Sequence, residues 1–105
     1  MLVRRDIPLA DQIVQVGHAC LEAGRRFVQP SAPCHLVVLE VPHRAALLDA
    51  ASRLDVVGLP YVLFWEPDDA MGYTALATRP VTTEQERRLF RRYPLWRESE
   101  GVREG

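Results

Sequence analysis

The sequence predicts one α/β domain, a three-layer sandwich in which a mixed four-stranded sheet carries helices on both faces. Short runs of aliphatic and β-branched residues alternate with longer runs whose apolar residues recur at spacings of three and four. Proline and glycine separate these runs. A chain of 105 residues, 48% of them hydrophobic, suits one ordinary core. We expect residues 1–96 to form the domain and residues 97–105 to be a polar, disordered tail.

The first half of the chain predicts two strands, each followed by a helix. Residues 1–5 begin with an apolar pair typical of a buried strand, which ends near Asp6. Residues 35–41 are a second β-branched run, and residues 42–54 return to helical spacing. The helix between the two strands begins near Ala10 and is expected to bury one apolar stripe. That stripe consists of Ile13, Val16, Gly17, Cys20, Leu21, Gly24 and Phe27.

The second half predicts two strands and one helix. Residues 61–65 and 73–78 are the strands, and residues 84–93 form the helix. Residues 94–96 are expected to join the edge of the sheet or to lie over the core. Helical crossovers connect the first three strands, which favours a parallel arrangement. The seven-residue connection at 66–72 is too short for a crossover, so the last two strands should be antiparallel.

Composition excludes several classes of function. All 13 basic residues are arginine, which rules out lysine Schiff bases and phosphate-binding P-loop lysines. The net charge of −1 argues against a nucleic-acid clamp that covers the whole surface, although a local basic patch stays open. Cys20 and Cys34 suit reduced, packed thiols, and no residues have the spacing of metal ligands. With no signal peptide and no long apolar run, we expect a cytoplasmic protein without a cofactor.

Several motifs resemble the type 2 peptidyl-tRNA hydrolase family in the same order. The segment Leu2-Val-Arg-Arg-Asp-Ile7, followed by Gln15-Val-Gly-His-Ala19, resembles that family's strand ending in Arg-x-Asp-Leu and its helix carrying Gln-x-x-His-Ala. The segment Thr74-Ala-Leu-Ala-Thr-Arg-Pro80 resembles the family's Thr-x-Leu-Ala-x-Gly-Pro strand. Across residues 2–96 the chain looks most similar to the divergent peptidyl-tRNA hydrolase domain-containing members.

The resemblance implies the family's fold and hydrolysis of the ester bond of peptidyl-tRNA or of a related aminoacyl ester. The resemblance thus implies a carboxylic-ester hydrolase of translation whose partner is a tRNA-linked ester. Two departures favour an alternative, a weakly active or inactive tRNA-binding or regulatory member of the same fold. Asp11 stands where the family has a lysine, and the loop before the last strand is reduced to Asp69-Ala-Met-Gly72.

The candidate catalytic residues are Gln15, His18, Asp69 and Thr74. Gln15 and His18 are neighbours at i and i+3 on a polar helix stripe, and an imidazole suits a general base or a group that orients water. Gln15 would hold the carbonyl or the water, Thr74 would donate a hydrogen bond, and Asp69 would orient His18 or a water. The plain alternatives are an exposed helix histidine, a solvated glutamine, an ordinary strand threonine and a solvated loop aspartate.

The candidate substrate-binding residues lie where the first strand meets the first helix. Asp6 is at the carboxyl end of the strand, where α/β sheets bind ligands, although it also suits a turn cap. Asp11 is close to the helix N-terminus, and Arg5 is a candidate phosphate contact. A homodimer formed through exposed aromatic residues such as Trp65 and Trp96 is a further open interpretation.

Overall fold

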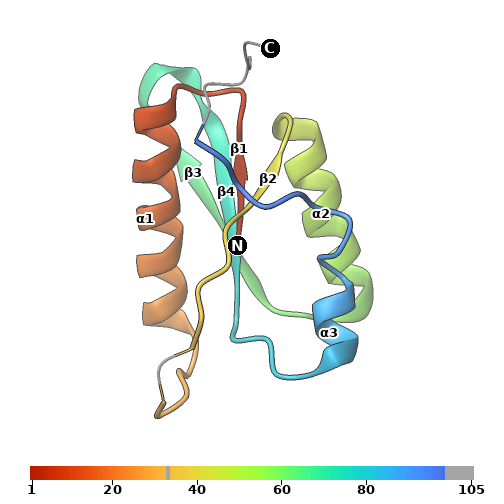
Figure 1. The fold of residues 1–105 in the computed structure, drawn as a ribbon. Helices are drawn as coiled ribbons and strands as arrows, with labels where there is room; N and C mark the ends of the chain where they lie inside the picture. Colours follow the sequence, from red (N-terminus) through yellow and green to blue (C-terminus); the bar gives the residue numbers. More distant parts are fainter. Residues whose placement is uncertain (33, 99–105) are drawn as a thin grey trace.

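The computed structural model describes residues 1–32 and 34–98, so residues 99–105 of the expected disordered tail lie outside the described residues. Strands and helices alternate as the sequence predicts, in an α/β arrangement (Figure 1). In chain order the elements are β1 (Leu2–Arg4), α1 (Leu9–Arg26), β2 (Leu39–Val41), α2 (Arg44–Val57), β3 (Tyr61–Glu66), the 3-10 turn η1 (Asp68–Ala70), β4 (Gly72–Thr78) and α3 (Glu84–Arg88).

The four strands form one mixed sheet in the order β2-β1-β4-β3. β1 and β2 are parallel, and β4 is antiparallel to both β1 and β3. The first three strands therefore share one direction and β4 runs against them, which confirms the mixed sheet. As a result, the carboxyl ends of β1, β2 and β3 and the amino end of β4 meet at the same edge of the sheet.

Helices cover both faces of this sheet, α1 on one side and α2 on the other (Figure 1). Adjacent residues of β1 divide between the two layers, because side chains alternate along a strand. Leu2 packs under α2 with Leu47 and Leu76, and Val3 packs under α1 with Ala19 and Ala75. These two apolar clusters form the core, and they confirm a helical layer on each face.

Three elements have a boundary that differs by three residues or more from the sequence prediction. β2 begins only at Leu39, and the preceding Leu36 and Val37 are largely exposed. α2 continues to Val57 and ends at Gly58, whose φ of 74° is the left-handed conformation that glycine adopts at little cost. α3 ends at Arg88 instead of residue 93, because the following turns close with three-residue backbone hydrogen bonds.

The segment after α3 returns to the sheet and covers the edge strand β2. Leu95 forms an antiparallel bridge with Leu39, and the Trp96 amide donates to the Val38 carbonyl at 2.8 Å. The Trp96 ring packs against the α1 cluster. This segment therefore joins the sheet edge and also covers the core, as the sequence suggested. Its bonds protect an edge that would otherwise present unpaired backbone groups.

α1 faces the sheet only partly as predicted: Val16 and Phe27 of the expected inner stripe pack against the apolar cluster under this helix, whereas other residues of the stripe do not. Ile13 and Leu21 of the expected inner stripe are 58% and 75% exposed, and Gly17 and Gly24 also face open space. The buried residues of the helix are instead Gln12, Gln15, Ala19 and Ala23. Two alanines let the helix lie close to the strands, and the two buried amides find hydrogen-bond partners there. Within the described ranges, no helix has both the length and the apolarity to cross a membrane.

Candidate functional site

The candidate site begins with a β-bulge in β4. Phe64 of β3 pairs with Ala75, whereas the next residue, Trp65, pairs with Tyr73, so Thr74 is an additional residue without an opposite partner. Strict alternation would send Thr74 to the face opposite Ala75. The bulge instead allows both residues to face α1, and bulges commonly re-aim a side chain in this way. Thr74 is completely buried there.

A buried chain of hydrogen bonds starts at this threonine. Thr74 Oγ1 donates to Gln15 Oε1 at 2.7 Å, and Gln15 Nε2 donates to Glu66 Oε2 at 3.0 Å. Gln15 is only 2% exposed, so its amide is satisfied by protein groups and not by bulk water. The chain joins α1, β3 and β4 and leads from the core to the partly exposed Glu66 carboxylate. The two hydrogen bonds fix the orientation of the Gln15 amide.

His18 lies one helical turn further along α1, at the surface. Its imidazole stacks on the Phe64 ring with a centroid separation of 4.9 Å and an interplanar angle of 6°. Hydrogen bonds from Gln15 and from the Asp68 amide lower the pKa of the Glu66 carboxyl, and the charge of His18 adds to this effect. Glu66 is therefore the anionic neighbour of an exposed imidazole whose ring plane is set by an aromatic residue.

A second glutamine holds the connection between β1 and α1. Gln12 is fully buried, and its Nε2 donates to the Ile7 carbonyl at 2.8 Å and to the Arg5 carbonyl at 3.2 Å. Its Oε1 accepts from Trp96 Nε1 at 2.7 Å. These bonds tie the turn before α1 to the last described segment. Gln12 thereby fixes where α1 begins, and with it the position of Gln15 one turn later.

The structure brings together only part of the predicted site. Gln15 and Thr74 are bonded, and His18 lies beside them. Asp69 is on the exposed η1 turn at φ 54°, and among the described residues neither Asp69 nor Asp11 makes a hydrogen bond or ion pair. An orienting contact from Asp69 to His18 is therefore absent from this structure. The interpretation of Asp11 as a substrate contact stays a prediction.

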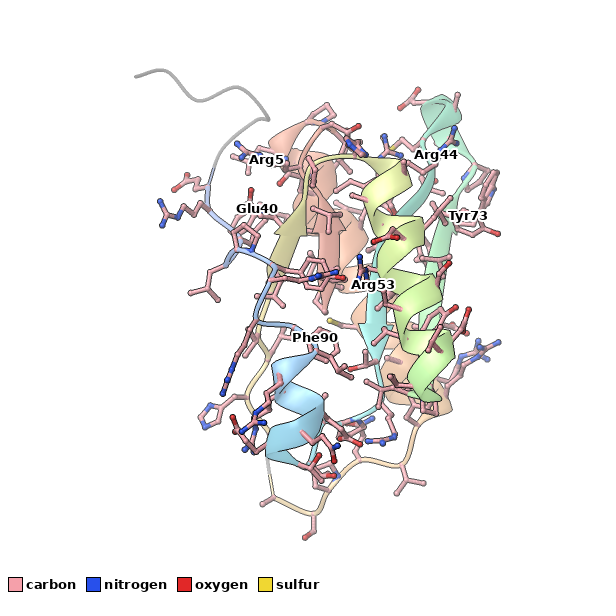
Figure 2. The ribbon with its side chains drawn as sticks, turned by 90° about the vertical axis from the view of Figure 1, so that its right-hand side faces the viewer. Arg5, Glu40, Arg44, Arg53, Tyr73 and Phe90 are labelled. Carbon is pink, nitrogen blue, oxygen red and sulfur yellow. The ribbon has the colours of Figure 1, made fainter. Side chains whose placement is uncertain are left out.

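The two other substrate-binding candidates are engaged in ion pairs. Asp6 accepts two hydrogen bonds of 2.9 Å from Arg4, whose guanidinium also donates to the Met71 carbonyl at 2.7 Å. Arg5 pairs with Glu40 at 3.1 Å, and these two residues lie together at one end of the sheet (Figure 2). Asp6 and Arg5 are thus each held in an ion pair that the sequence did not indicate.

An open groove of about 370 Å³ lies at the edge where the carboxyl ends of β1 and β2 meet. Arg4 and Asp6 form one wall, and His43 and Arg44 from the start of α2 form another. The lining is mostly polar, and its formal charge is positive because two arginines face one aspartate. This is the position at which α/β sheets bind ligands. Its residues are Arg4, Asp6, His43, Arg44, Ala45, Ala70 and Met71.

Sequence reasoning missed Glu66, Phe64, Gln12 and Trp96. Strand alternation was the available signal for the first two, because Val62, Phe64 and Glu66 project from the same face of β3. For Gln12 no such signal existed, since its burial depends on carbonyl groups of a turn and on a tryptophan 84 residues away.

No protein-family model matches the chain, and no curated protein shows significant similarity to it.

Within the described residues, Cys20 and Cys34 are free thiols, Cys34 being exposed instead of packed. The same residues contain no group of three or more histidine, cysteine, aspartate or glutamate side chains that suits a metal ion.

Proposed function

We propose that this protein hydrolyses the ester bond of peptidyl-tRNA or of a related aminoacyl ester. The observation that carries the proposal is the buried Thr74–Gln15–Glu66 chain beside the exposed His18. It combines an amide and an imidazole from segments whose motifs resemble type 2 peptidyl-tRNA hydrolases with a carboxylate from β3. The fold proposed with this function is that family's variant of the three-layer α/β sandwich.

In the proposed reaction, His18 is the general base. Its imidazole takes a proton from water as the water oxygen attacks the ester carbonyl carbon, and Glu66 stabilises the imidazolium that forms. The bond between the carbonyl carbon and the ribose oxygen then breaks. The imidazolium returns its proton to that oxygen, so a free carboxylic acid and a ribose hydroxyl are released. Gln15 and Thr74 act as positioning residues, because their hydrogen bonds hold the Glu66 carboxylate in place beside His18.

The polar groove at the strand ends is the proposed site for the tRNA phosphates. Arg44 lines it, and its guanidinium ends so close to Gly72 that a Cβ at that position would lie 2.9 Å from Nη1. Arg44 and Tyr73 lie toward the same end of the molecule (Figure 2). Phosphate binding by arginine weakens as salt concentration rises, because bound counterions are released on association.

The alternative is a binding or regulatory protein of the same fold without significant catalysis. One observation favours it: both polar ends of the Gln15 amide are already bonded inside the protein, to Thr74 and Glu66. The chain then stabilises the contact between α1 and the bulge, and Asp11 replaces the lysine that the family resemblance would lead one to expect. The polar groove would serve the same ligand in both interpretations.

Peptide release from an N-acetylated aminoacyl-tRNA tests the two functions. We expect His18→Ala to lower kcat/KM roughly 100-fold, the scale of lost general-base catalysis. His35→Ala is the matched control, since His35 is also an exposed histidine but lies in the connector before β2. Glu66→Gln should lower kcat while it keeps a polar partner for Gln15.

The outcomes separate the hydrolase from the binding protein. No turnover above that of heat-inactivated protein, together with tRNA binding that weakens with salt and with Arg44→Gln, would establish the binding alternative. Turnover that His18→Ala and His35→Ala leave equally unchanged would place the active site elsewhere. If the protein shows no turnover and also no salt-dependent tRNA binding, both proposals are refuted.

A further inference from the structure

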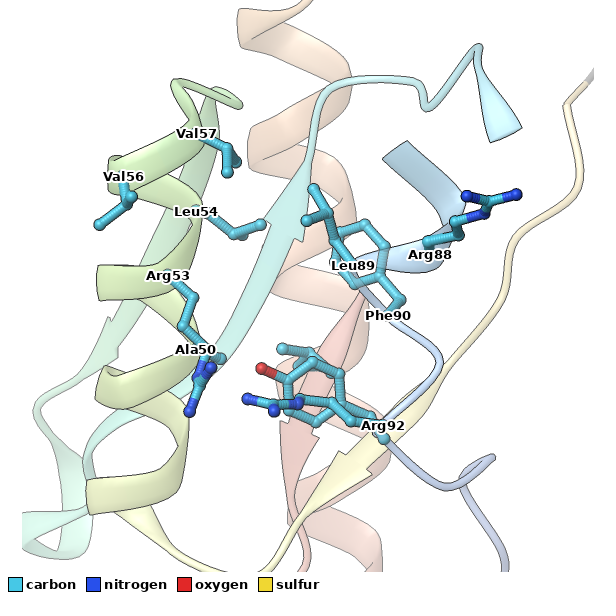
Figure 3. A pocket seen from close by; sticks show the side chains of 11 residues that line it. Ala50, Arg53, Leu54, Val56, Val57, Arg88, Leu89, Phe90 and Arg92 are labelled. Atoms are coloured by element: carbon cyan, nitrogen blue, oxygen red, sulfur yellow. The ribbon is translucent and has the colours of Figure 1, made fainter. Parts of the chain in front are cut away.

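A further groove lies on the α2 face, away from the Gln15 site. It is a groove of about 470 Å³ between the last turns of α2 and the segment that follows α3 (Figure 3). Leu54 and Val57 form the α2 wall, and Leu89, Phe90 and Tyr93 form the other wall. A volume of this size with a mainly apolar lining and few polar groups is typical of small-molecule sites.

The charged residues that line this groove are all arginines. Arg53 from α2 and Arg92 from the facing segment extend toward the groove from opposite walls, whereas Arg88 points away at the rim (Figure 3). Arg53 has one acidic partner, Asp49, at 2.8 Å. Arg92 has no hydrogen bond or ion pair with any residue that the structure describes. Two guanidinium groups thus approach one apolar space, and among the described residues only that of Arg53 has a carboxylate partner.

This arrangement favours an anionic ligand over other chemistries. Like charges that approach the same low-dielectric surface repel, and a ligand anion placed between them removes that repulsion. Guanidinium groups bind carboxylate and phosphate through charge-assisted, often bidentate, hydrogen bonds. The apolar walls add a requirement for hydrocarbon, because burying apolar surface is favourable by about 25 cal/mol per Å². A bare inorganic anion satisfies only the first of these two requirements.

We propose that this groove binds a monomeric amphipathic anion, a single hydrocarbon chain or ring system that ends in a phosphate or carboxylate. The hydrocarbon lies against Leu54, Val57 and Leu89, and the anionic head lies between Arg53 and Arg92. The inference is independent of the proposed hydrolase, since none of these residues belongs to the Gln15 site or to the polar groove.

Titration calorimetry with octyl phosphate tests the proposal on the native chain. We expect octyl phosphate to bind at least tenfold more tightly than inorganic phosphate. Octyltrimethylammonium should not bind. Hexyl phosphate should bind roughly 15-fold more weakly than octyl phosphate, because it lacks two methylenes and each buried methylene contributes roughly 0.8 kcal/mol. Equal affinity for the cationic and anionic amphiphiles would overturn the proposal.

Charge variants assign the head group. Arg53→Gln and Arg92→Gln should each weaken octyl phosphate binding about tenfold, the scale of one lost charge-assisted hydrogen bond. Arg25→Gln is the matched control, because it makes the same charge change on an exposed arginine of α1 that pairs with Glu22. All three positions are solvent-exposed, and melting curves check that each variant folds. A loss with Arg25→Gln equal to that with Arg92→Gln would refute the assignment.

A bilayer presents the same amphipathic anions at its surface, so a vesicle arm distinguishes the source. Vesicles of phosphatidylglycerol are sedimented with the protein in parallel with the calorimetry. We expect no co-sedimentation, since the groove is concave and binds one chain at a time. Co-sedimentation without binding of octyl phosphate would overturn the proposal in favour of a membrane surface.

Discussion

Replacement of Thr74 by valine removes one buried hydroxyl and keeps the shape of the side chain. Thr74 is completely buried, and its hydroxyl donates to Gln15 Oε1 at 2.7 Å. The variant leaves that carbonyl oxygen without its donor at a position only 2% exposed. An unsatisfied buried polar atom costs about 1–3 kcal/mol. With an unfolding entropy of roughly 2.1 cal/mol/K per residue, Tm should fall by roughly 5–14 °C.

Thr78→Val is the matched control for this substitution. Thr78 is the last residue of β4, it is half-buried, and within the described chain its hydroxyl makes no hydrogen bond. The same chemical change there should alter the free energy of unfolding by less than about 0.5 kcal/mol. Thermal melts and urea titrations followed by circular dichroism measure both variants.

A double-mutant cycle isolates the bond between Thr74 and Gln15. Gln15→Leu removes the amide that the valine variant would leave unsatisfied, so Thr74→Val combined with Gln15→Leu should cost less than the sum of the single changes. Glu66, the other partner of Gln15, is partly exposed and can turn to water. Additive costs, or a Thr74→Val cost no larger than that of Thr78→Val, would refute the buried chain.

Three further predictions concern stability. Trp96→Phe removes the indole donor to Gln12 at 2.7 Å and should cost about 1 kcal/mol or more in chemical unfolding. Gly58→Ala places a Cβ at φ 74° and should cost roughly 1 kcal/mol, measured by thermal melting, with no change in fold by circular dichroism. The Arg79 hydrogen bond lowers the pKa of Glu86 from 4.5 to about 2, so the charged form stabilises the fold above pH 4.5 and this stabilisation is lost as pH falls toward 2. Glu86→Gln should therefore lower Tm at pH 7, and its difference from the native chain should shrink between pH 4.5 and 2; a difference independent of pH would contradict this.

The direction of each strand could be predicted from the sequence, because it follows from connection lengths, whereas the insertion of β4 between β1 and β3 could not. A helix between two strands permits parallel pairing, and the short connection after β3 forces a reversal. The path of the segment around Trp96 was also within reach, since an apolar run after the last helix must be buried somewhere. These features depend on local pattern alone.

The inner face of α1 could not be predicted in the same way. Two stripes compete on this helix, one with Ile13 and Leu21 and one with Gln12 and Gln15. Hydropathy favours the first stripe, because an isolated amide costs free energy when it is buried. The second stripe is the buried one, since carbonyl groups of the β1–α1 turn, the Thr74 hydroxyl and the Trp96 indole satisfy both amides. Those partners are distant in sequence, so no periodicity reveals them.

In the candidate site, too, some residues could be predicted from the sequence and others could not. Gln15 and His18 were accessible to sequence reasoning because three-residue spacing places them together on a helix. The role of Glu66 was not, because it depends on the register of β3 against β4 and on the bulge that turns Thr74 toward α1. Asp69 was a candidate to orient His18 or a water, with a solvated loop aspartate as the alternative, and the η1 turn leaves it in an exposed left-handed conformation.

The position of β4 has a consequence for how the chain acquires its structure. β4 is the last strand in sequence, yet it lies between β1 and β3 and is bonded to both. A nascent chain that ends before Gly72 therefore holds two unconnected parts of a sheet, with nothing to join β3 to β1. Cooperative folding must wait for the final third of the sequence, and contacts across some seventy residues must form in that step. Ribosome-bound fragments should accordingly remain protease-sensitive until β4 has left the exit tunnel, and then become protected in a single step.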